Sequence, residues 1–65
     1  DFFTSRELEI ISLIKQGLNS KNISDRLFIS PHTVATHRKN ILKKSNCHSS
    51  KELLEFCGKN GIPLE

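Results

Sequence analysis

The sequence lacks the segments from which a membrane anchor or an export signal is built. It contains no run of about 18 consecutive apolar residues that would cross a bilayer. Its first residues, Asp1, Phe2 and Phe3, do not supply the charged and apolar regions of a signal peptide. We therefore expect a cytoplasmic domain that makes no contact with membranes.

Methionine is absent and cysteine is scarce. Because the chain has no initiator Met, we expect Asp1 to be a cut site within a longer protein whose other domains lie upstream. Nine residues separate Cys47 from Cys57, which matches no C-x2-C metal spacing, and a cytosolic pair is expected to stay reduced. We interpret both cysteines as small apolar packing residues.

Neither the size of the chain nor the spacing of its reactive residues favours an enzyme. A domain of 65 residues buries only about 60% of the surface of its unfolded chain, which leaves little room for an enclosed pocket. His32 and His37 are five residues apart, so a helix would place them on different sides rather than stacked at i and i+4. No nucleophile with a base and no paired carboxylates stand out. We expect no catalysis, no metal and no other cofactor.

Acidic residues are missing from one long stretch. Between Arg26 and Lys51 the chain has six basic residues and neither Asp nor Glu, whereas all seven acids lie outside this stretch. The net charge of +3 therefore understates the local field, and a polyanion is the expected partner. The six basic residues are Arg26, Arg38, Lys39, Lys43, Lys44 and Lys51.

What the sequence does contain is a series of helix signals with no strand-like alternation, which predicts an all-α fold. Thr4 followed by Glu7 is a capping box, so we expect a first helix at about Ser5 to Gln16, with Gly17 as its stop. Asn19 is placed to cap a second helix at about Ser20 to Leu27.

A third helix follows after a turn of about three residues. Ser30 is its predicted cap and Pro31 its first residue, and it should run to about Lys44, which is roughly 21 Å at 1.5 Å per residue. Phe28 and Ile29 are expected to supply apolar contacts across the turn.

The third helix should have a buried side and an outward side. Val34 and Ile41 are seven residues apart and mark the buried side. A helix with this outward charge suits a DNA groove, because phosphate affinity comes from Lys, Arg and helix amino-terminal ends. The residues left for the outward side are His32, Ala35, Thr36, Lys39 and Lys43.

A second capping box, Ser49 with Glu52, predicts a fourth helix at about 50–59, which Gly61 and Pro63 end. Its apolar residues occupy too wide an arc to cover only one small core, so we expect part of this surface to contact another molecule. These residues are Leu53, Leu54, Phe56 and Cys57.

Three motifs resemble the LuxR-type helix-turn-helix found at the carboxyl end of bacterial response regulators and quorum-sensing activators. Residues 3–11 read FTSRELEII, close to the family's Leu-Thr-x-Arg-Glu-x-Glu-Val-Leu opening. Residues 20–23, SKNI, are similar to its Ser-Asn-Lys-Glu-Ile. Residues 29–41, ISPHTVATHRKNI, are similar to its Ile-Ser-x-x-Thr-Val-Lys-x-His-x-x-Asn-Ile. The resemblance covers nearly the whole chain and implies one domain over residues 1–65, with the helix-turn-helix at about 19–44.

The resemblance implies sequence-specific binding of double-stranded DNA in transcriptional regulation. The third helix would lie in the major groove, and the fourth would join two copies as a homodimer. Lys21 would contact a phosphate, whereas His37 would either lie at the edge of the core or bond a phosphate. Ala35 stands where the family usually has Lys, which favours contact with a thymine methyl. The expected DNA-contacting residues are Lys21, His32, Thr33, Ala35, Thr36, His37, Lys39 and Lys43.

Two alternatives remain open at this point. One is the promoter-reading domain of a sigma factor, which would contact RNA polymerase directly. The other is a small helical protein-interaction module, for which the basic helix would only provide solubility. For Lys44, contact with DNA and a solvated position are equally compatible with the sequence, and a sensor or receiver domain upstream is expected in the full-length protein.

Overall fold

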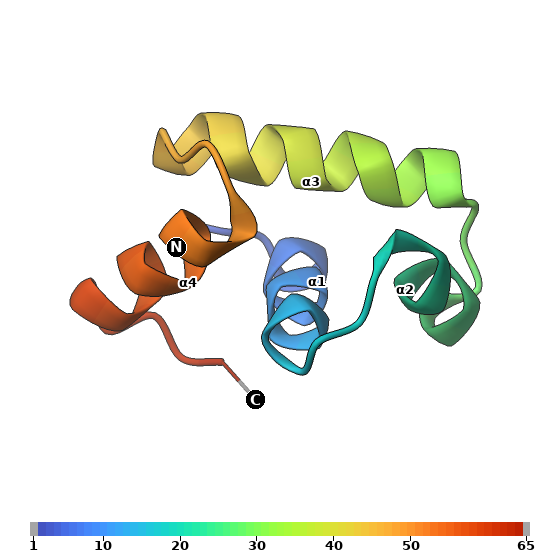
Figure 1. Ribbon diagram of the computed structural model, residues 1–65, viewed down its shortest axis with the longest axis horizontal. Coiled ribbons are helices and arrows are strands. Elements are labelled where there is room, and N and C mark those ends of the chain that lie inside the picture. The colour runs from blue at the N-terminus through green and yellow to red at the C-terminus, as the bar shows by residue number, and fades with distance from the viewer. Residues whose placement is uncertain (1, 65) are drawn as a thin grey trace.

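The computed structural model describes residues 2–64, and these form four helices with α3 lying across the other three (Figure 1). Beneath α3 the figure shows α4, α1 and α2 in that order, and α3 contacts each of them. The bounds are α1 Ser5–Lys15, α2 Ser20–Leu27, α3 Pro31–Ser45 and α4 Ser50–Lys59. The predicted all-α fold is confirmed, with helix ends within one residue. Asp1, the expected cut site, and Glu65 lie outside the described residues.

The first helix starts with the predicted capping box. The Glu7 backbone N–H donates to Thr4 Oγ1 at 3.1 Å, and the Thr4 N–H donates to Glu7 Oε1 at 2.8 Å. These bonds satisfy two of the amide groups that a helix start leaves without partners. Gly17 has a φ of 92°, which an L side chain rarely adopts, and it ends the helix as expected.

The connection between α2 and α3 is the predicted three-residue turn, Phe28 to Ser30. Ser30 caps α3 by accepting from the Thr33 N–H at 3.0 Å. Ile29 packs against the core, but the expected apolar contact of Phe28 is wrong, since its side chain is 94% exposed. Phe28 has a left-handed φ of 58°, and this conformation, which reverses the chain, turns its ring away from both helices.

Only half of the second predicted capping box forms. Ser49 Oγ accepts from the Glu52 N–H at 3.2 Å, as expected. The Glu52 carboxylate, however, accepts from the N–H of His48 at 3.2 Å rather than from that of Ser49. The bend before α4 brings His48 to the carboxylate, so the start of α4 is still held by two bonds.

Every helix contributes to the hydrophobic core. Val34 and Ile41 of α3 are fully buried, which confirms the predicted inner side of that helix. The core residues are Phe3, Ile10, Ile11, Leu13, Ile14, Ile23, Val34, Ile41, Leu53 and Cys57.

The apolar arc of α4 requires a correction. Leu53 and Cys57 are 1% exposed and belong to the core, so they are not available for the expected dimer contact. Leu54 and Phe56 are half-buried on the two flanks of α4. Leu54 borders a hollow together with Ile62 of the tail that follows α4.

On the other flank, the Phe56 ring lies 5.6 Å from that of Phe2 and 6.4 Å from that of Phe3, centroid to centroid. The arc is wide because both ends of the chain pack against α4, so a partner molecule is not needed to explain it.

Candidate nucleic-acid interface

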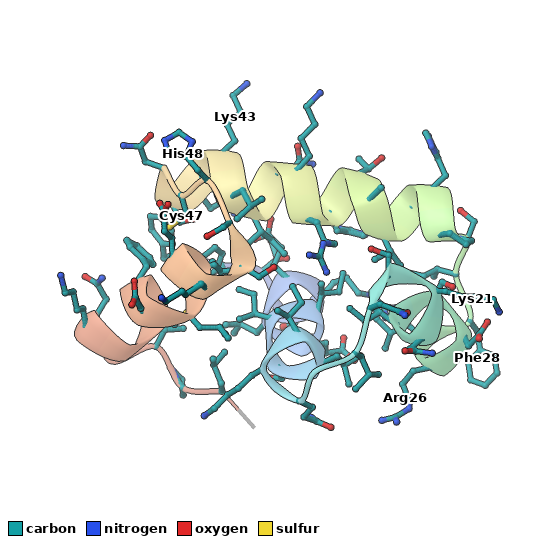
Figure 2. All side chains as sticks on the ribbon, viewed as in Figure 1. Lys21, Arg26, Phe28, Lys43, Cys47 and His48 are labelled. Atoms are coloured by element: carbon teal, nitrogen blue, oxygen red, sulfur yellow. The ribbon has the colours of Figure 1, made fainter. Side chains whose placement is uncertain are left out.

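One side of α3 faces away from the other helices. At 3.6 residues per turn this side is opposite Val34 and Ile41, and Figure 2 shows Lys43 extending from it, away from the rest of the molecule. We call its exposed residues the outward stripe, which consists of His32, Ala35, Thr36, Lys39 and Lys43. The structure thus brings together the five residues that the sequence placed on this side.

The amino-terminal end of α3 is built to present backbone N–H groups. Thr33 Oγ1 lies 2.9 Å from Ser30 Oγ, so the capping hydroxyl and a first-turn hydroxyl are joined. Pro31 at the first position has no N–H to satisfy. Ser30 is exposed and Thr33 half-buried, so an anion can approach the positive end of the helix dipole.

The six basic residues of the acid-free stretch do not share one face. Figure 2 shows Arg26 below α2, on the side opposite α3. The guanidinium of Arg38 is half-buried, and its Nη2 donates to Ser50 Oγ on α4 at 3.0 Å. Lys51 lies on α4. Lys39 and Lys43 form no ion pair within residues 2–64, so they supply the charge of the outward stripe.

Lys44 faces inward. Its Nζ lies 2.7 Å from Glu7 Oε1 and 5.7 Å from the centroid of the Phe3 ring. Burial of Glu7 favours its neutral form, but hydrogen bonds from Lys44 and Thr4, with the charge of Lys44, outweigh burial and lower the pKa of Glu7 below its usual value. This ion pair ties the start of α1 to the end of α3 and gives Lys44 a structural role that the sequence did not predict.

The remaining predicted contact residues lie beside the outward stripe. Lys21, in the first turn of α2, has its Nζ 3.6 Å from Asp25 Oδ2, and both side chains are largely exposed. Such a pair in water contributes little, so Lys21 can exchange Asp25 for a phosphate at small cost. His37 is half-buried on α3.

Asn40 is a residue that the sequence reasoning missed. It is exposed on α3 one turn after Thr36, on the flank of the outward stripe. Its side chain has no hydrogen-bond partner among residues 2–64. The signal that would have found it is its spacing of four residues from Thr36, which places the two on adjacent turns of one side.

Two features are absent from residues 2–64, a cluster of metal-ligating side chains and a membrane-spanning helix. No group of three His, Cys, Asp or Glu within residues 2–64 converges on a point that would hold a metal ion. None of the described helices is long and apolar enough to span a membrane.

Comparison with known proteins gives a consistent result. Residues 1–57 match the family model described as bacterial regulatory proteins, luxR family. The chain is 40% identical over 60 residues to the uncharacterized transcriptional regulatory protein YxjL of Bacillus subtilis, covering 92% of the chain and 28% of that protein. It is 43% identical over 59 residues to the oxygen regulatory protein NreC of Staphylococcus carnosus, covering 91% of the chain and 27% of that protein.

A third relative is BvgA of Bordetella pertussis, a putative positive transcription regulator of virulence factors, at 36% identity over 59 residues, 91% of the chain and 28% of that protein. The chain therefore spans less than a third of the length of these relatives.

Proposed function

Since the chain belongs to the luxR family of bacterial regulatory proteins and is a DNA-binding domain of a transcriptional regulator, we propose that it reads duplex DNA by placing α3 in the major groove. One observation carries this proposal. The outward stripe is exposed along α3, contains no acid, has two lysines without an ion pair among residues 2–64, and follows a capped helix start. A helix of about 10–12 Å diameter fits a major groove about 12 Å wide.

The phosphate contacts in this proposal come from three places. Lys39 and Lys43 extend from the outward stripe, the first N–H groups of α3 lie beside Ser30 and Thr33, and Lys21 extends from α2. Phosphate contacts of this kind fix the register of a protein on the duplex, whereas side chains at the base edges select the sequence. Thr36 and Ala35 are the uncharged residues that would meet the bases.

Pairing of two copies through α4 on DNA is also part of the proposal. Isologous pairing would place two α3 helices on half-sites about one helical turn, or a multiple of it, apart. The surface available for the contact is the exposed side of α4, with Lys51 and Glu55, and the half-buried flanks at Leu54 and Phe56. We further propose a cytoplasmic regulator in which a receiver or sensor domain precedes this one and RNA polymerase is contacted at the promoter.

The test is a salt titration of duplex binding by the chain and its Lys39→Ala variant. If Lys39 contacts a phosphate, the variant binds more weakly, and the slope of log K against log salt falls by about one unit. Lys15→Ala is the matched control, because Lys15 is an exposed lysine in the last turn of α1, outside the proposed DNA and pairing surfaces. Equal slopes for the chain and the Lys39→Ala variant would contradict the groove assignment, and binding without salt dependence would favour a protein-interaction module.

A further inference from the structure

The base selectivity of α3 depends on which hydrogen-bond groups the fold leaves available on its outward side. Guanine presents two acceptors, N7 and O6, in the major groove, so its reader must be a donor, and Arg is the commonest one. Arg38 is the single Arg of α3, and it is half-buried with its Nη2 bonded to Ser50 Oγ at 3.0 Å. The fold therefore removes the strongest guanine reader from the outward side.

The hydroxyl proton of Thr36 is also engaged in a hydrogen bond within the protein. Its hydroxyl donates to the backbone carbonyl oxygen of His32 at 3.1 Å. A hydroxyl has one proton, so with this bond in place Thr36 can only accept a hydrogen bond from a base. Thr36 and Ala35 are both exposed, and each side chain has a methyl group. Neither residue can donate to guanine, whereas methyl groups contact the C5 methyl of thymine.

Unlike Thr36, Asn40 has donor and acceptor groups that form no hydrogen bond within residues 2–64. The three hydroxyl side chains of α3, those of Thr33, Thr36 and Ser45, bond the capping residue or their own helix. The Asn40 amide is exposed and unbonded within residues 2–64, although Asn is among the weaker helix formers. An amide that offers one donor and one acceptor matches N7 and N6 of adenine.

We infer that α3 selects A·T base pairs where Ala35, Thr36 and Asn40 face the groove, with thymine methyls against Ala35 and Thr36 and adenine bonded by Asn40. Donors to guanine on the outward stripe are limited to Lys39, Lys43 and the ring N–H of His32. This inference rests on the proposed function and adds the chemistry of the preferred half-site. Ala35 and Asn40 lie on opposite flanks of the outward stripe, so the selected pairs lie on both sides of the Lys39 contact.

The test begins with selection of binding sites by the 65-residue chain from a pool of randomised duplexes, followed by titration of the preferred duplex. Each adenine is then replaced by 7-deazaadenine, which lacks the N7 acceptor, and each thymine by deoxyuridine, which lacks the methyl. One deazaadenine position should weaken binding by about tenfold, the scale of a bidentate base contact. One deoxyuridine position should weaken it by about fourfold, the scale of one buried methyl.

Two variants show which residue is responsible for each loss of duplex affinity. Asn40→Ala should bind the original and the deazaadenine duplexes equally. Thr36→Ser, which keeps the hydroxyl, should lose the effect of deoxyuridine at the thymine that Thr36 contacts and keep it at the thymine that Ala35 contacts. Asn40→Ala should not lower the melting temperature, because Ala is the better helix former. Asn60→Ala, at the end of α4, is the control. Its affinity for the duplex should still fall with both base replacements.

The outcomes separate this inference from the proposed function. A preferred duplex with G·C pairs at these positions, or equal deazaadenine losses in the chain and its Asn40→Ala variant, overturns the A·T assignment and leaves DNA reading by α3 intact. If the selection enriches no sequence, both the assignment and sequence-specific reading fail.

Discussion

At the scale of the single residue, Phe28 is unusual in both its exposure and its backbone conformation. It is an aromatic side chain that is 94% exposed, at a backbone φ of 58°. A left-handed conformation costs an L residue roughly 1–2 kcal/mol, and the residue that ends a helix in this way is usually Gly. Its ring gains little from burial in return. Phe28 therefore lowers the stability of the turn that positions α3.

We predict that Phe28→Gly stabilises the chain by about 0.5–1 kcal/mol, because Gly adopts the left-handed φ without strain but gives back part of the gain as unfolded-chain entropy. Urea denaturation measures the change. Asn46→Gly is the comparison, since Asn46 has a similar φ of 56° but tolerates it better, so its change should be smaller. A loss of stability in Phe28→Gly would show that the ring makes contacts that stabilise the fold.

At the scale of the element, the Glu7–Lys44 pair adds an ionic link between α1 and α3 to the contacts of the core. It joins the first turn of α1 to the last turn of α3, and the same carboxylate completes the cap of α1. Removing Glu7 would therefore loosen two helix ends at once. No residue of the outward stripe takes part in this contact.

We predict that Glu7→Gln destabilises the chain by about 1–3 kcal/mol at neutral pH, because Gln keeps the cap acceptor but removes the charge paired with Lys44. Since the fold lowers the pKa of Glu7, the stabilisation is fully present above the pKa of the unfolded chain. It is lost as the pH falls through the lower pKa of the folded state.

Denaturation of both proteins across acidic and neutral pH measures this dependence. The gap between them should close on acidification. Glu9→Gln is the control, because the Arg6–Glu9 pair is exposed, with 3.9 Å between Nη1 and Oε1, and should contribute less than about 1 kcal/mol. A gap that stays constant with pH would exclude the charge of Glu7 as its cause.

At the scale of the whole molecule, the core is small and each helix depends on it. A chain of 65 residues has a stability of only about 3–10 kcal/mol. Leu53 connects α4 to the core with 1% of its surface exposed, whereas its neighbour Leu54 is half-buried. Loss of one core side chain is therefore a large fraction of the total.

We predict that Leu53→Ala destabilises the chain by about 2–5 kcal/mol by leaving a cavity, which is enough to unfold much of the population. Leu54→Ala should cost clearly less, because part of its surface is already in water. Circular dichroism during urea titration compares the two variants. Equal losses would mean that Leu54 is as fully packed as Leu53, for example against a second copy of the chain.

Local signals in the sequence determined the helices of this protein. Ser30, Pro31 and the Thr4–Glu7 pair act over three or four residues, so the cap, the first turn and the length of each helix follow from neighbours along the chain. The spacing of Val34 and Ile41 likewise determined which side of α3 is buried. The outward stripe could be predicted for the same reason.

The tertiary structure alone decided which charges remain available. Arg38 meets Ser50 and Lys44 meets Glu7 across 12 and 37 residues of sequence, and no local pattern specifies contacts of that range. The flanks of α4 are covered by the two ends of the chain for the same reason. Composition located the positive charge on one stretch, but the packing of the helices directed its residues to different faces. It left Lys39 and Lys43 on the outward stripe with no ion pair among residues 2–64, beside the Asn40 amide, which has no hydrogen-bond partner among these residues.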